Sequence, residues 1–248
     1  MANERQERPD ETTPVSASAT VSGVLDWGID ELPTEDELGV EDDKPVESTR
    51  HRKQSNLMMH LLERVWGDRD DACIAGDLAL HYRHRHPPVV PDVMVVLGVE
   101  KRERKAYLMW NEDKGPDWVL ELLSASNAAK DREQNYSIYE QRVRVPEYVW
   151  FNPDDPKELR GFRLVGDEYE EVAPDEHGRL WSKVLGHSLG VHEGWLRLYD
   201  RDGHLVPTDG EAREAAEELA RIAQQRAETA EAELARLREE LARQKGDG

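Results

Sequence analysis

The sequence predicts an α/β protein in which helices flank a mixed central sheet and a long helix ends the chain. Three observations point to this class: an amphipathic helical pattern, a series of short apolar runs, and a proline-free stretch of helix formers. The apolar runs lie at residues 93–97, 118–123 and 146–151. Runs of this length, bounded by turn residues, are typical of strands that are buried on both faces.

Length and composition allow one domain with appended segments. The chain has 248 residues, of which 38% are hydrophobic and 35% charged, so part of it is expected to lie outside a packed core. Residues 1–28 are acidic and poor in large apolar side chains, which predicts a disordered N-terminus. We therefore expect a folded domain over residues 29–207 and a helical segment over residues 208–248.

Charge and cysteine content restrict the classes of function. Cys73 is the single cysteine, so the chain can form no internal disulfide, and its N-terminus lacks the apolar segment of a signal peptide. No apolar run approaches the length of a membrane span, and a soluble cytoplasmic protein is the simplest interpretation. The net charge of −20 argues against broad, non-specific binding to phosphate backbones. Two basic stretches, residues 81–86 and 101–105, are candidate phosphate-facing surfaces, with solvated loops as the favoured interpretation.

The first helix is expected to begin near Ser48 or Thr49 and to end before the polar residues 67–71. Its apolar side chains recur at helical spacing, which predicts one buried face. That face consists of Leu57, Met58, Leu61, Leu62, Val65 and Trp66.

Strands and a second helix follow in the order expected of a central sheet. Residues 73–82 alternate like a strand, residues 98–115 are polar and predict a loop, and a helix is expected over residues 124–141. The strands at 118–123 and 146–151 enclose this helix, an arrangement that implies a right-handed parallel crossover.

The last part of the chain changes character. Residues 158–181 alternate short strand-like pieces with turn signals, which predicts a hairpin on the sheet edge, and residues 196–199 predict a final strand. Residues 209–244 lack proline and consist of strong helix formers, so we expect one long helix.

Apolar residues of this last helix follow alternating steps of four and three, the pattern of a coiled-coil seam over about four heptads. The seam consists of Ala216, Ala220, Ala223, Ala227, Ala230, Leu234, Leu237 and Leu241. Alanine fills its first half, so association is expected to be weak there, and a single solvated helix is an equally weighted alternative.

Two carboxylates stand where the pattern predicts buried strands. Glu121 lies inside an apolar run, where an ionised carboxylate costs roughly several kcal/mol unless it is paired or binds a metal. Asp92 lies at the head of another run. If the two strands are neighbours, both carboxylates can reach one point, where water and phosphate oxygens would complete a Mg²⁺ site. The alternatives are a charge that protects a sheet edge for Glu121 and a turn residue for Asp92.

A series of motifs resembles a known family. In chain order these are PVESTRH, AGDLALHY, PDVMVVLG, WVLELLSASN, DREQNYSIY and VPEYVWFNPD. From about residue 45 to residue 199 the chain resembles the Uma-two family of putative restriction endonucleases, within the PD-(D/E)XK nuclease superfamily. The resemblance implies a restriction-endonuclease-like core and an endonuclease that hydrolyses phosphodiester bonds in DNA with Mg²⁺, or with Mn²⁺, as cofactor.

The resemblance also implies roles for individual residues. Asp92 and Glu121 would be the metal carboxylates, and Glu47 would be an auxiliary acidic ligand. The lysine of the superfamily would follow Glu121 by two positions, but that position is Leu123.

Family members often carry the lysine on the following helix instead, four residues before the position of Tyr139. Here that position is Asn135, which can hydrogen-bond a water but brings no positive charge. Arg132 lies on the same helical face and is the nearest substitute cation; it would be a poor general base but would stabilise phosphate charge well.

Two hypotheses of different classes follow. The leading one is a metal-dependent endonuclease with DNA as its substrate. The alternative is a catalytically impaired nuclease-fold protein that acts as a binding or assembly module and forms homo-oligomers through its C-terminal helix. Dependence of cleavage on both a divalent metal and Glu121 would separate them.

Overall fold

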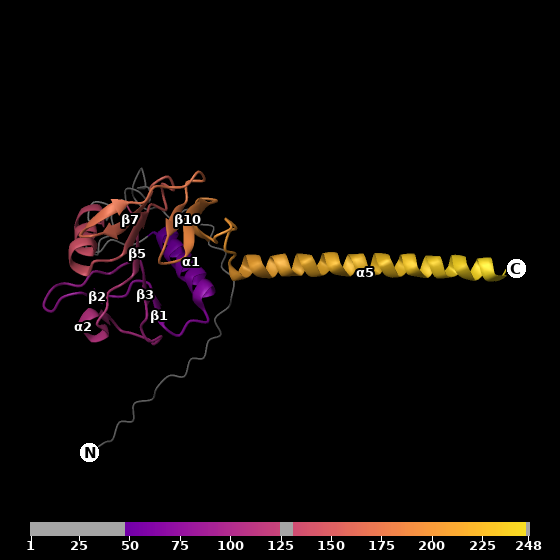
Figure 1. Cartoon of the computed structure of the whole chain (residues 1–248), viewed down its shortest axis with the longest axis horizontal. Coiled ribbons are helices and arrows are strands. Elements are labelled where there is room, and N and C mark those ends of the chain that lie inside the picture. The colour runs from indigo at the N-terminus through magenta and orange to yellow at the C-terminus, as the bar shows by residue number, and fades with distance from the viewer. Residues whose placement is uncertain (1–47, 125–130, 247–248) are drawn as a thin grey trace, which may run out of the picture. The chain divides into compact units, whose positions relative to one another are not determined.

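A computed structural model describes residues 48–124 and 131–246 of the chain (Figure 1). The segment predicted to be disordered, residues 1–28, lies outside the described residues, as does Glu47. Within the described ranges, no helix has both the length and the apolar character needed to cross a membrane.

A six-stranded mixed sheet forms the centre of the fold and confirms the predicted class. Its strand order is β1-β3-β5-β6-β7-β8. The strands are β1 (Ala72–Ala75), β3 (Val93–Leu97), β5 (Trp118–Leu122), β6 (Glu147–Phe151), β7 (Leu159–Val165) and β8 (Glu168–Glu171). The pair β5–β6 is parallel, as the predicted crossover requires, and every other neighbouring pair in this sheet is antiparallel.

Helix α1 (Thr49–Trp66) covers one face of this sheet (Figure 1). It begins where the sequence predicts, because the Ser48 hydroxyl accepts a hydrogen bond from the backbone N–H of His51 and so caps the helix. Three of its predicted core residues are fully buried, namely Met58, Leu61 and Leu62. They pack against the β3 and β5 side chains that point to the same face, which fixes the helix over the centre of the sheet.

A helical segment on the opposite face follows β5 and returns the chain to β6. It consists of the π-helical turns η1 (Asp131–Asn135) and η2 (Tyr139–Val143), with the short α4 (Tyr136–Ile138) between them. An aromatic cluster seats it on the sheet, formed by Tyr136, Tyr139, Tyr148, Trp150, Phe162 and Tyr169. The predicted helix over residues 124–141 is thus described from Asp131 onward, while residues 125–130 lie outside the described part.

A separate three-stranded sheet follows the large one along the chain. It pairs β9 (Leu180–Ser182), β10 (His187–His192) and β11 (Trp195–Tyr199) in the order β11-β10-β9. The predicted hairpin on the sheet edge is correct for β7 and β8, but the predicted region 158–181 also takes in β9, which belongs to this second sheet. The sequence reasoning missed β10, whose exposed and buried residues do not alternate regularly.

The prediction of one strand over residues 73–82 is wrong, because the strand β1 ends at Ala75. A side chain at Gly76 would approach the Met59 sulfur to 2.5 Å and the Asp92 carbonyl oxygen to 3.2 Å, and Asp77 has a φ of 52°. The chain resumes as β2 (Leu80–His81).

The predicted loop at residues 98–115 is also partly ordered. It contains β4 (Tyr107–Leu108), which pairs in parallel with β2, and the single-turn helix α2 (Met109–Glu112). Elements this short carry no periodic signal in the sequence, so tertiary pairing decides them.

Helix α5 (Asp209–Gly246) matches the long helix predicted for the end of the chain. Along the predicted seam, Leu234 is 48% exposed and Leu237 is 58% exposed, whereas the side chain of Leu241 lies outside the described ones. The described part of the seam is therefore left uncovered by residues 48–124 and 131–246, and its role in association stays a prediction.

The first turn of α5 is tied to β11 by an ion pair. The buried guanidinium of Arg197 donates to both carboxylate oxygens of Glu211, at 2.9 and 2.6 Å, and also to the Val206 carbonyl at 2.9 Å. Hydrogen bonding to Arg197 lowers the pKa of Glu211 from its ordinary 4.5 to about 2, against the opposing effect of burial.

We predict that Glu211→Gln destabilises the fold at neutral pH by roughly 1–2 kcal/mol, less than a fully buried charge pair because the Glu211 side chain is 44% exposed. Since the pKa of Glu211 is lowered by folding, its contribution is complete above about pH 4.5 and is lost as the pH falls toward 2.

Urea unfolding of wild type and variant at pH 7 and pH 3 measures this effect. The difference between them should shrink at the lower pH. Glu214→Gln, an exposed neighbour on the same helix, is the matched control and should unfold like the wild type at both pH values. A constant difference across this range would contradict the assignment.

Candidate functional site

Strand pairing brings the two predicted carboxylates to the same end of the central sheet. In the antiparallel register of β3 and β5, Val93 pairs with Leu120, so one further step sets Asp92 opposite Glu121. Both residues are buried, with exposed fractions of 6% and 3%. The expectation that the two strands are neighbours is therefore confirmed, and the closeness of the two carboxylates stays a prediction.

The Asp92 carboxylate binds the backbone beside Glu121. Its Oδ2 accepts a hydrogen bond from the Leu122 N–H at 2.5 Å. Its Oδ1 lies 3.4 Å from Nε2 of His51, near the start of α1. The same Nε2 lies 2.9 Å from the Leu122 carbonyl, and because a carbonyl only accepts, this nitrogen must carry a hydrogen. His51 thus links α1 to both partners.

The backbone of Asp92 is fixed from two further sides. The Ser55 hydroxyl donates to its carbonyl oxygen at 3.1 Å. Gly76 packs so closely that any Cβ there would lie 3.2 Å from the same oxygen. A carboxylate on a backbone fixed in this way keeps its position without a bound ligand, which favours a preorganised binding site.

Glu121 faces the other helical layer. Its Oε1 accepts hydrogen bonds from the Tyr139 hydroxyl at 2.7 Å and from the Asn135 amide nitrogen at 3.2 Å. Both donors are themselves buried, at 0% and 5% exposed. A carboxylate in an apolar sheet is tolerated only when such donors replace lost water, so they account for the fold accepting a charge here.

The predicted site residues are not all placed with equal detail. Asn135 contacts Glu121 directly, and its role in chemistry stays a prediction. Arg132 lies in η1, three residues before Asn135, but its side chain lies outside those described. Glu47, predicted as an auxiliary ligand, lies outside the described residues altogether.

His51 was not assigned a role by the sequence analysis. The signal that could have found it is a group of polar residues on α1: His51, Gln54 and Ser55 follow helical spacing, lie on the same face as the apolar Met58, and are all buried. Buried polar residues at the start of an amphipathic helix need partners at the strand ends beneath them. That requirement points to the sheet end that carries Asp92.

Asp92 and Glu121 supply the type of ligand that a Mg²⁺ ion takes in proteins. Such an ion is commonly held by one or two carboxylates, with water and substrate phosphate oxygens completing its shell. Tyr139 and Asn135 supply the hydrogen bonds that orient a ligating carboxylate from behind. Asp92 is held by His51 of α1 and Glu121 by Tyr139 of the helical segment, so the two carboxylates are fixed from opposite layers of the sheet, and a shared ion stays a prediction.

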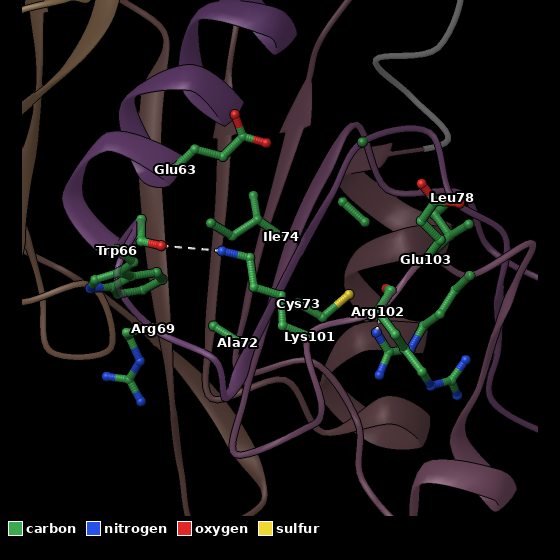
Figure 2. A pocket seen from close by; sticks show the side chains of 14 residues that line it. Glu63, Trp66, Arg69, Ala72, Cys73, Ile74, Leu78, Lys101, Arg102 and Glu103 are labelled. Atoms are coloured by element: carbon green, nitrogen blue, oxygen red, sulfur yellow. Dashed lines mark hydrogen bonds between the residues drawn. The ribbon is translucent and has the colours of Figure 1, made fainter.

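A pocket of about 850 Å³ lies apart from these residues, along β1 between the end of α1 and the segment 101–104 (Figure 2). Burial raises the pKa of the Cys73 thiol in its wall, which keeps the sulfur protonated and unreactive. Lys101 donates to the Gly67 carbonyl at 3.2 Å, as Figure 2 shows. The pocket therefore lacks an activated nucleophile, and Asp92, Glu121 and Asn135 are not part of its lining.

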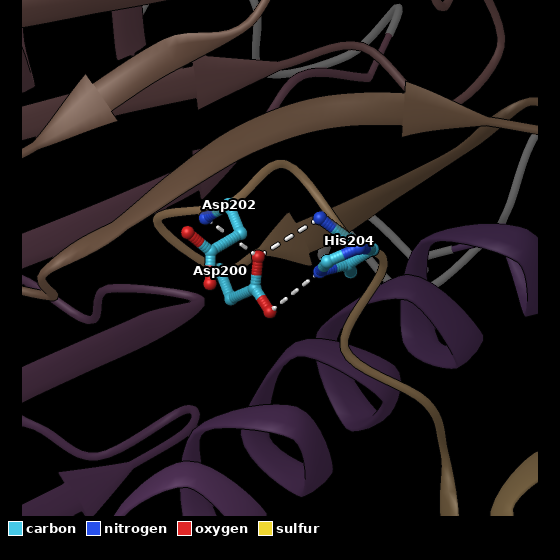
Figure 3. Close-up of side chains that lie close together, drawn as sticks. All are labelled: Asp200, Asp202 and His204. Atoms are coloured by element: carbon cyan, nitrogen blue, oxygen red, sulfur yellow. Dashed lines mark hydrogen bonds and ion pairs between the residues drawn. The ribbon is translucent and has the colours of Figure 1, made fainter.

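Asp200, Asp202 and His204 form the cluster of metal-ligand types found within the described ranges (Figure 3). Its geometry is that of a turn after β11. Asp200 Oδ1 accepts from the backbone N–H groups of Asp202 and His204 at 2.9 and 2.8 Å, and donation by His204 lowers the pKa of Asp200. These hydrogen bonds explain why the three residues lie close together: the Asp200 side chain closes the turn that contains Asp202 and His204.

Comparison with known proteins shows which family the chain belongs to. No curated protein matches the chain. Among solved structures, the chain is similar to the crystal structure of a putative nuclease belonging to DUF820 from Anabaena variabilis ATCC 29413. The two share 17% sequence identity over 57% of this chain and 76% of that one, with a TM-score of 0.44. A family model described as "Uma2: Putative restriction endonuclease" matches residues 40–198, well over half of the 248 residues. The chain therefore belongs to the Uma2 family of putative restriction endonucleases.

Proposed function

We propose that this protein is a metal-dependent endonuclease that hydrolyses phosphodiester bonds in DNA. The observation that carries the proposal is the pairing of β3 with β5, which sets Asp92 beside Glu121 at one end of a mixed sheet. Membership of a family of putative restriction endonucleases supports the reaction class. In this proposal Asp92 and Glu121 hold Mg²⁺, or Mn²⁺ in its place.

The chain's own residues prepare the site for this reaction. When bound, the metal would polarise the phosphodiester and supply hydroxide at neutral pH. The Leu122 N–H holds the Asp92 carboxylate, and Tyr139 and Asn135 hold that of Glu121. Hydrolysis forms a new bond from a water oxygen to phosphorus while the bond to the leaving oxygen breaks. Fixed ligands lower its barrier because they need no reorganisation as charge develops.

Negative charge that develops on the phosphate needs a nearby cation. Asn135 is neutral and already donates to Glu121, so it can orient a group but cannot offset charge. Arg132, earlier on the same helical segment, is the basic residue that we propose for this role. Its guanidinium suits phosphate oxygens because it donates from a planar fork.

Asn135 also favours a second candidate function. An uncharged Asn135 buried against Glu121 is consistent with a nuclease fold whose chemistry is impaired. Such a protein would act as a binding or assembly module and self-associate through the exposed leucines of α5. The experiments that follow distinguish the two functions.

We predict that Glu121→Gln lowers Mg²⁺-dependent nicking of plasmid DNA by roughly 100-fold or more, because it removes a charged ligand and keeps the side chain's shape. The metal-free variant should melt at or above the wild-type temperature, since Tyr139 and Asn135 can still donate to the amide oxygen. Nicking is measured at low salt, with and without Mg²⁺ or Mn²⁺.

Glu170→Gln is the control, because Glu170 is exposed on β8 and the substitution removes the same charge. It should nick at the wild-type rate. If wild type and Glu121→Gln nicked equally in matched preparations, the activity would come from a contaminant and the catalytic assignment would fail.

We predict that Asn135→Lys raises the nicking rate, because it places a cation beside Glu121 where phosphate charge develops. Asn135→Met has a side chain of similar length without the charge and should not raise it.

Arg132→Ala should lower the wild-type rate if Arg132 stands in for the lysine. Activity in Asn135→Lys alone would mean that the natural chain has lost its chemistry, which selects the second candidate function.

The assembly role predicts that full-length protein forms homo-oligomers through α5. Leu234→Glu combined with Leu237→Glu should shift the mass measured by light scattering to that of a monomer, because charges replace the apolar seam. Leu219→Glu, on the same helix but outside the seam, is the control and should leave the mass unchanged. An unaltered mass in the double variant would reject association through this seam.

A further inference from the structure

The loop between β2 and β3, residues 82–88, carries exposed positive charge on a strongly acidic protein. Arg83, His84, Arg85 and His86 are all exposed. No ion pair joins Arg83 or Arg85 to a carboxylate anywhere in the described part of the chain. On a chain of net charge −20, a local group of uncompensated cations is a place where a polyanion can bind.

The backbone of this loop is held at its base and at its tip. Leu80 and Val89 exchange two backbone hydrogen bonds, of 2.8 and 3.1 Å, which close the loop. Within it, the His86 N–H donates to the Arg83 carbonyl at 3.3 Å, and Arg85 has a φ of 60°. The two arginines therefore project from a defined turn, so less ordering entropy would be lost when they bind a ligand.

Trp110 of α2 contacts the loop and the strand that leads into it. Its ring lies 6.2 Å from the ring of His81 and 6.3 Å from that of His84, both edge to face. The pairing of β2 with β4, which leads directly into α2, brings these rings close together. Trp110 remains 46% exposed, so this aromatic support lies at the surface beside the cations.

The second basic stretch, residues 101–105, behaves differently. Arg102 and Arg104 both bind Glu112 of α2, at 2.5 and 2.9 Å, and hydrogen bonding to Arg104 lowers the pKa of Glu112. Arg102 also lies 3.7 Å from Glu100, so two carboxylates offset the charge of these two arginines. Helix α2 thus contacts both basic stretches of the sequence, but its carboxylate pairs only with arginines of the second.

The loop leads directly to the candidate site. Only two residues lie between its base at Val89 and Asp92, so the Cα atoms of Val89 and Asp92 are at most about 11 Å apart along an extended chain. A DNA strand with its scissile phosphate at Asp92 and Glu121 would have neighbouring phosphates within reach of a loop that starts so near. Phosphate contacts of this kind position a duplex without reading its sequence.

We propose that residues 82–88 form an arm that binds the DNA phosphate backbone beside the scissile bond, with Arg83 and Arg85 as the contacting cations and Trp110 as a positioning residue. This inference rests on the proposed endonuclease function and adds the surface that holds the substrate. It also accounts for DNA binding by a chain whose net charge repels phosphates.

The test measures binding separately from cleavage. Full-length protein without divalent metal is titrated into a fluorescein-labelled 20-base-pair DNA duplex, and anisotropy is followed over a series of salt concentrations. Arg83→Gln with Arg85→Asn should weaken binding roughly tenfold and reduce the salt slope by about 1.8, the value for two lost phosphate contacts. Asparagine is chosen at position 85 because it tolerates a positive φ.

Two controls separate the arm from bulk charge and from folding. Arg213→Gln with Arg226→Asn, at exposed arginines of α5, changes the net charge equally and should leave affinity and slope unchanged. Trp110→Ala should weaken binding and reduce the salt slope, and Trp110→Phe should restore most of both. All variants should melt like the wild type.

The possible outcomes distinguish this inference from the proposed function. Wild-type affinity in the arm variant, an equal loss in the α5 control, or no duplex binding by wild type would each overturn the arm. Loss of binding in the arm variant supports the arm even if wild type nicks no plasmid, in which case only the proposed function fails. Nicking that depends on Glu121, with binding indifferent to Arg83 and Arg85, would leave the function standing without the arm.

Discussion

The antiparallel pairing of β3 with β5 is the constraint on which the site depends. It places a strand that begins directly after Asp92 against a strand that ends at Leu122, so Asp92 and Glu121 lie at the same end of the sheet. The hydrogen bond from the Leu122 N–H to Asp92 fastens this junction, and a slip of one residue would turn each side chain to the wrong face. Helix α1 adds His51 at the same point, which ties the first helix to both strands.

Burial of charge at this junction is balanced by donors from two layers. Asp92 is held on the side of α1, and Glu121 receives hydrogen bonds from Tyr139 and Asn135 on the other side. Without such donors a buried carboxylate would cost several kcal/mol, roughly, or would take up a proton. The π-helical turns around Asn135 and Tyr139 bring both side chains over Glu121, which agrees with the frequent occurrence of such turns at functional sites.

Ion pairs divide the arginines of the described chain into two kinds. Arg104, Arg163 and Arg197 bind Glu112, Glu147 and Glu211, and each pair joins one segment of the fold to another segment or element. They stabilise the fold and contribute no net positive surface. Arg83 and Arg85 stand outside this pattern and are exposed beside an aromatic side chain. An acidic protein can therefore bind a polyanion through a small region, because screening limits repulsion from distant carboxylates to about the Debye length.

By itself the sequence determined the fold class, α1, the three central strands and the long C-terminal helix, since these follow from apolar periodicity. It also singled out Asp92 and Glu121 as carboxylates at or in buried strands, and their role in chemistry stays a prediction. Tertiary structure alone decided three features: β1 ends before Gly76, β2 pairs with β4, and β9 belongs to the three-stranded sheet. Close contacts and partners elsewhere in the chain control these features. Tertiary structure also brought His51 and Tyr139 to this end of the sheet. Their hydrogen-bond partners, Leu122 and Glu121, lie 71 and 18 residues away in the chain. Local patterns can show that a residue is buried and polar, but only the folded chain determines which group satisfies it.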